Sequence, residues 1–193
     1  DPYGPWLEPV FGGYGIPVTS SLSQPAVANP ETRAWLDLVR ALGRDLERGA
    51  LLGFLDAVLP REQARLAEQL AREAAVVRGE HDWLAALDAA RPEPGLDALR
   101  SAIECAIDAR RAFAASRSFA ETASIALALG AGLSDDDGRA ALEGAAGLDA
   151  IERAAGAAHP FTPETAAAAL ESLLLELATP WRARDDGGVR ILD

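Results

Sequence analysis

Apolar residues recur at helical spacing along most of this chain, and no other feature constrains its fold as strongly. Trp35, Leu38, Val39, Leu42 and Leu46 follow one another at intervals of three or four residues, which places them on one face of a helix. Similar stripes return in later segments, and the chain contains 42 alanines, the residue with the highest helix propensity. We therefore predict an all-α fold, a bundle of six to eight helices with an extended N-terminal arm.

Prolines, glycines and capping residues indicate where the predicted helices begin and end. Residues 29–31, Asn-Pro-Glu, suit the first turn of a helix, and we expect that helix to end at Gly49. A long apolar stripe begins at Leu96, and residues 116–118 are the place where it can kink or break. The bundle is expected to extend over residues 30–181.

Residues 1–29 form the predicted arm. The first 30 residues contain six prolines and four glycines, which exclude regular helix. They also contain four of the 11 aromatic residues, whereas disordered tails are poor in aromatics. We expect Trp6, Phe11 and Tyr14 to be buried against a protein partner or a second copy of the chain. The alternative is that the arm folds back onto its own bundle.

Residues 182–193 are predicted to be an extended C-terminal tail. The segment Val189-Arg190-Ile191-Leu192 follows two glycines and forms either a short strand or an extended end.

The net charge of −12 argues against a nucleic-acid ligand or an anionic membrane surface, both of which require a basic face. No run of 18 apolar residues is present, so we expect no membrane partner and no transmembrane helix. All 18 basic residues are arginines, which excludes Schiff-base and P-loop lysine chemistry. The single cysteine, Cys105, excludes an internal disulfide and favours a cytoplasmic location, although a periplasmic protein without disulfides is also allowed.

No catalytic, cofactor-binding or metal-binding residue is predicted. His81 and His159 lie far apart in the sequence, and metal sites need clustered ligands. Cys105 lies among alanine and isoleucine residues on a helix that we expect to be buried, so we interpret it as a small core residue rather than a nucleophile.

Arg110 and Arg111, with Arg117 one to two turns further on, form the one local basic cluster. Glu104 and Asp108 are close in the sequence, so internal ion pairing is the first interpretation. Contact with an external anion or carboxylate is the second.

These observations predict a non-catalytic protein–protein interaction module, an accessory subunit, adaptor or assembly factor of a bacterial complex. One alternative is a helical small-molecule-binding or enzymatic domain with an apolar pocket. The aromatic residues that would line that pocket are Trp35, Trp83, Phe113 and Phe119. A further alternative, consistent with the acidic charge, is an immunity or antitoxin protein.

Overall fold

A computed structural model describes residues 18–20, 23–25, 29–133, 136–144, 161–176, 178–180 and 189–191 of the 193-residue chain. Eight helices account for most of these residues, and the predicted all-α, multi-helix fold is confirmed. The helices are α2 (Pro30–Gly43), α3 (Arg48–Val58), α4 (Arg61–Glu73), α5 (Glu80–Ala89), α6 (Leu96–Ala115), α7 (Phe119–Leu129), α8 (Asp136–Glu143) and α10 (Pro163–Glu176). None of the helices in the described ranges is long and apolar enough to span a lipid bilayer.

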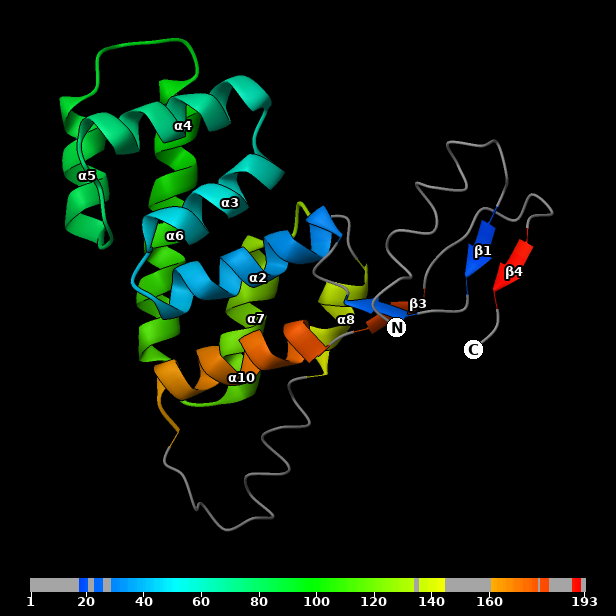
Figure 1. Ribbon diagram of the computed structural model, residues 1–193. Coiled ribbons are helices and arrows are strands. Elements are labelled where there is room, and N and C mark those ends of the chain that lie inside the picture. The colour runs from blue at the N-terminus through cyan, green and yellow to red at the C-terminus, as the bar shows by residue number, and fades with distance from the viewer. Residues whose placement is uncertain are drawn as a thin grey trace.

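Helix α2 is the central element of the bundle. It lies between α3 and α10, and α6 and α7 pass behind it (Figure 1). Its buried residues include Trp35, Leu38, Val39 and Leu42, none of which has any exposed surface. A helix that is apolar around most of its circumference is stable only when other helices cover it on several sides. The sequence of α2 therefore dictates its central place.

Helices α4 and α5 extend the bundle beyond α3 (Figure 1). A buried tryptophan, Trp83, connects this part to the centre. Trp83 of α5 is fully buried, and its indole Nε1 donates a hydrogen bond of 2.8 Å to the carbonyl oxygen of Leu46. The ring contributes apolar packing while its single polar atom is satisfied, as a buried tryptophan requires. The turn between α2 and α3 is thereby held against α5.

Two pairs of three-residue strands join the beginning of the chain to its end. Strand β1 (Val18–Ser20) pairs in parallel with β4 (Val189–Ile191), so Thr19 faces Arg190 in the register. Strand β2 (Ser23–Pro25) pairs antiparallel with β3 (Ala178–Pro180). Part of the predicted arm thus pairs with the same chain, and the segment near residue 190 forms a strand rather than an unpaired extended end.

Some helix boundaries in the structure agree with those predicted from the sequence, and one differs. Helix α2 begins at Pro30 as predicted, and the expected break at residues 116–118 separates α6 from α7. The predicted end at Gly49 is wrong, because α2 ends at Gly43 and Gly49 lies inside α3. The cause is a turn in which Asp45 and Leu46 adopt φ angles of 56° and 54°, a conformation that non-glycine residues rarely take.

Candidate functional site

One face of α2 remains polar and turned to solvent. Arg33, Asp37, Arg40 and Arg44 follow each other at intervals of four, three and four residues, which places them in one line along the helix. The rest of the helix is largely buried. The bundle therefore displays a row of charges along its central helix, with α10 on one side and α3 on the other (Figure 1).

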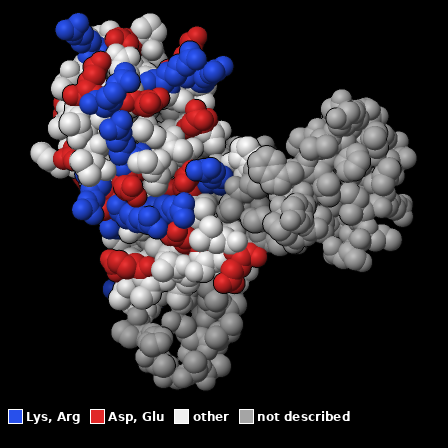
Figure 2. All heavy atoms as spheres, in the orientation of Figure 1, with Lys and Arg blue, Asp and Glu red and all other residues white. Residues whose placement is uncertain are grey.

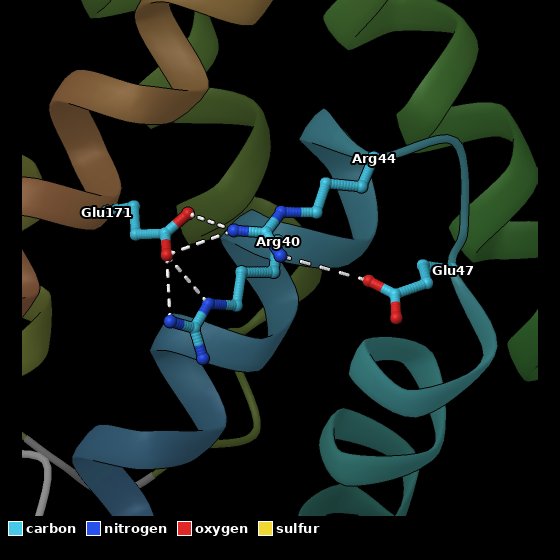
Figure 3. Close-up of polar contacts among 4 residues, drawn as sticks. All are labelled: Arg40, Arg44, Glu47 and Glu171. Carbon is cyan, nitrogen blue, oxygen red and sulfur yellow. Dashed lines mark hydrogen bonds and ion pairs between the residues drawn. The ribbon is translucent and has the colours of Figure 1, made fainter.

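On the α10 side, a single carboxylate binds two guanidinium groups (Figure 3). Arg40 donates to Glu171 Oε1 from Nε at 2.9 Å and from Nη2 at 2.7 Å. Arg44 Nη2 donates to the same carboxylate at 2.9 Å and 3.1 Å. Burial raises the pKa of Glu171, but the hydrogen bonds and positive charges of the two arginines outweigh burial and lower its pKa overall. This network fastens α10 to α2.

On the α3 side, the same row of charges lies in a cavity of about 700 Å³. The cavity is bounded by α2, by α3 and by the loop at Gly132 and Leu133. Small residues form its α3 wall, namely Gly49, Ala50, Gly53 and Ala57. Besides Pro30 and Ala34, the remaining lining residues are charged, namely Arg33, Asp37, Arg40, Arg44, Glu47 and Asp56. We call this cavity the α2–α3 groove.

Asp37 is the chemically unusual group in the α2–α3 groove. Its carboxylate is half-buried, and among the described residues it forms no hydrogen bond and no ion pair. Burial raises the pKa of Asp37, whereas the charges of Arg33 and Arg40 act in the opposite direction without cancelling the effect of burial. A carboxylate that loses water without gaining a partner destabilises the fold, so the site is suited to accept hydrogen bonds from a bound cation.

Gly53 brings α3 close to that carboxylate. A Cβ atom at position 53 would lie 2.4 Å from Oδ2 and 2.9 Å from Cγ of Asp37. Every other amino acid would therefore displace the Asp37 side chain. The glycine gives the carboxylate its place in the groove.

The face that carries α2, α3 and α4 is rich in arginine, with acidic side chains between the arginines (Figure 2). Opposite charges are thus mixed on this face rather than separated into broad patches. A ligand for such a surface needs charges of both signs in a matching order.

The three residues predicted to bind a partner, Trp6, Phe11 and Tyr14, lie outside the residues that the structure describes. The aromatic residues considered for an apolar pocket are core residues instead. Trp35, Trp83 and Phe113 have no exposed surface and Phe119 retains 6%, and none of them lines the α2–α3 groove.

Cys105 is exposed, so its prediction as a core residue is wrong. Its neighbours Ile103, Ala106 and Ile107 face the core, whereas Cys105 lies on the other side of α6. The local composition suggested burial, but the helical period places this residue on the solvent side. Within the described ranges, no three His, Cys, Asp or Glu side chains gather closely enough to hold a metal ion.

The basic cluster of α6 divides into two environments. Arg111 forms ion pairs with Glu80 and with Asp108, in agreement with internal pairing. The side chain of Arg110 lies beside Asp45 instead, with its Nε 3.8 Å from Asp45 Oδ1.

Sequence reasoning missed the α2–α3 groove. Its signals are present in the sequence, as charges at helical spacing within an apolar helix and as four small residues on one face of the next helix. Neither signal shows that the charged face of α2 and the small-residue face of α3 lie against each other.

The chain matches no protein-family model, and comparisons with curated proteins and with solved structures likewise give no match.

Proposed function

We propose that this chain is a non-catalytic protein–protein interaction module, an accessory subunit, adaptor or assembly factor, which binds a segment of a partner protein in the α2–α3 groove. The observation that carries the proposal is the half-buried carboxylate of Asp37, which has no partner among the described residues. Natural folds retain such unfavourable groups mainly where function requires them.

The chemistry of the groove specifies the segment that fits it. The partner segment should place a basic side chain next to Asp37, because a charge-assisted hydrogen bond would compensate the carboxylate for its lost hydration. Arg33 and Arg40 lie one helical turn away on either side of Asp37, so acidic residues should flank that basic residue. The low α3 wall of glycine and alanine leaves room for the backbone of the segment. The net charge of −12 also favours the approach of a basic partner.

The first test is capture of partners from a lysate of the cells that produce the chain, with wild type and two variants compared by quantitative mass spectrometry. Asp37→Asn removes the groove carboxylate while keeping the size of the side chain. Asp97→Asn makes the same change at an exposed position in the first turn of α6, away from the groove. We expect a protein that is enriched by wild type and Asp97→Asn but not by Asp37→Asn. Equal capture by all three would contradict the proposal.

Selection from a random peptide library tests the predicted chemistry of the segment. Wild type should select peptides with one Arg or Lys flanked by Asp or Glu, and selection on Asp37→Asn should lose the basic residue. A purely apolar consensus, or the same consensus on both proteins, would contradict the assignment of Asp37.

The N-terminal arm is proposed to supply a second contact through Trp6, Phe11 and Tyr14. Deletion of residues 1–16 removes these side chains but leaves the strand pairings of β1 and β2 intact. We expect the native mass measured by sedimentation to show loss of the partner or the second copy, with unchanged helical circular dichroism. Association that survives the deletion would remove the arm from the proposal.

A further inference from the structure

A second cavity, of about 570 Å³, lies where the C-terminal end of α2, the turn before α5, helix α6 and the start of α10 meet. Six of the described residues that line it are charged, namely Arg44, Asp45, Glu47, Arg78, Arg110 and Glu164. We call it the arginine cavity. Its volume falls within the range of small-molecule sites, about 300 to 1,000 Å³.

The walls of the arginine cavity are fixed by backbone contacts. Asp45 and Leu46 hold left-handed conformations, which are unfavourable for non-glycine residues. Three hydrogen bonds between residues 45–48 and residues 77–83 help to maintain this turn. Gly79 N donates to Asp45 O at 2.6 Å, Arg48 N to Val77 O at 3.0 Å, and Trp83 Nε1 to Leu46 O at 2.8 Å. The cavity is therefore built before any ligand arrives.

Arg110 is incompletely satisfied in this cavity. Only 21% of its side chain is exposed, and its Nε is shielded from solvent and has no hydrogen-bond partner in the described part of the chain. The nearest carboxylate oxygen, Asp45 Oδ1, lies 3.8 Å from that nitrogen, which is too far for a hydrogen bond. Arg78 has no ion pair or hydrogen bond with a described residue. By contrast Arg111, the next residue on α6, has two acidic partners.

Among the described residues the charges of the cavity are balanced, with three guanidinium groups and three carboxylates. A simple anion would meet the repulsion of the acids, and a simple cation that of the arginines. A ligand that carries both charges a few bonds apart satisfies both sets at once. We propose that the arginine cavity binds a small zwitterion, a free amino acid or short peptide, with its carboxylate on Arg78 and Arg110 and its ammonium group among Asp45, Glu47 and Glu164. Arg44 and Glu47 line both this cavity and the α2–α3 groove, but the proposal does not require a partner segment in the groove.

Isothermal titration calorimetry with three related probes tests the proposal. The probes are the dipeptide Ala-Ala, its N-acetyl derivative and its C-terminal amide, which differ only in the charges at their ends. We expect wild type to bind the free dipeptide with a dissociation constant of about 1 mM or lower. Each derivative, which lacks one charge, should bind at least about ten-fold more weakly.

Variants then assign the site. Arg110→Gln should weaken dipeptide binding at least about ten-fold, and Arg111→Gln, one residue away on the outer surface, should leave it unchanged. If circular dichroism shows that Arg110→Gln disturbs the fold, Arg78→Gln replaces it, because Arg78 is exposed in a turn. The proposal is overturned if the dipeptide does not bind. It is also overturned if either derivative binds as well as the dipeptide, or if folded Arg110→Gln, or Arg78→Gln in its place, binds like wild type.

Discussion

On the side of α2 that faces α10, Glu171 accepts hydrogen bonds from both Arg40 and Arg44, whereas on the side that faces α3, Asp37 has no partner among the described residues. Both carboxylates are partly buried, yet the pKa of Glu171 is lowered and that of Asp37 is raised. The first arrangement stabilises the fold and the second destabilises it. This difference is the basis of the proposal that a partner segment binds on the α3 flank of α2.

Glycine replacements test how tightly the surroundings of α2 are packed. A Cβ atom at Gly43 would lie 2.4 Å from Ala167 Cβ, which is attached directly to the backbone of α10 and cannot move aside. We expect Gly43→Ala to destabilise the protein by about 2 kcal/mol, even after the gain in helix propensity. Urea unfolding measures this change. Gly132→Ala, where a Cβ meets nothing within 4 Å, should change stability by less than about 0.5 kcal/mol.

Replacement of Glu171 tests the α10 flank directly. Glu171→Gln keeps the shape but removes the charge, and we expect a loss of about 1 kcal/mol at pH 7, since the arginines are partly exposed. The folded-state pKa of Glu171 lies below the ordinary value of 4.5, so its stabilisation is present above pH 4.5 and disappears as the pH falls through the folded-state pKa. The difference between wild type and variant should therefore shrink toward pH 3. Glu176→Gln, at the exposed end of the same helix, is the control.

Replacing the carboxylate of Asp37 by an amide should have the opposite effect on stability. Its folded-state pKa is raised above 3.8, so the ionised carboxylate lowers stability at neutral pH, and this penalty vanishes once the group is protonated. We expect Asp37→Asn to stabilise the protein at pH 7 by less than about 1 kcal/mol, because the side chain is only half-buried. The gain should be absent at pH 3. A loss of stability at pH 7 would show that Arg33 and Arg40 already compensate the carboxylate.

The sequence allowed the helical class and several boundaries to be predicted because those depend on local signals. Pro30 fixes the start of α2 through its own backbone geometry, and the polar residues at 116–118 interrupt a helix wherever it packs. The end of α2 could not be predicted, because Asp45 and Leu46 take left-handed conformations that hydrogen bonds with residues 77–83, distant in the sequence, help to maintain. The backbone preferences of aspartate and leucine disfavour the positive φ angles of this turn.

The candidate site was harder to predict than the helix boundaries, because it is formed by residues that are distant in the sequence. The proximity of Asp37 to Gly53 follows from the packing of α3 on α2, and the pairing of Val18–Ser20 with Val189–Ile191 joins opposite ends of the chain. Neither relationship leaves a periodic trace in a single sequence. Charge spacing is enough to place the row of side chains on one face of α2, although we did not use it to predict a site, but only tertiary structure distinguishes the paired carboxylate from the unpaired one.

Gly53→Ala should separate function from stability on the α3 flank. The methyl group displaces the flexible end of Asp37 rather than a backbone, and alanine in the middle of α3 contributes about 0.5 to 1 kcal/mol of helix propensity. The two effects should nearly cancel, so urea unfolding should show a change below about 0.5 kcal/mol. Capture of the groove-dependent partner should nevertheless be lost, because the carboxylate no longer occupies its position. Gly49→Ala lies on the same groove wall, and its Cβ meets only Glu47 Oε1 at 3.8 Å, so it should gain stability and retain the partner. Retention of the partner by both variants would show that the position of Asp37 does not govern recognition.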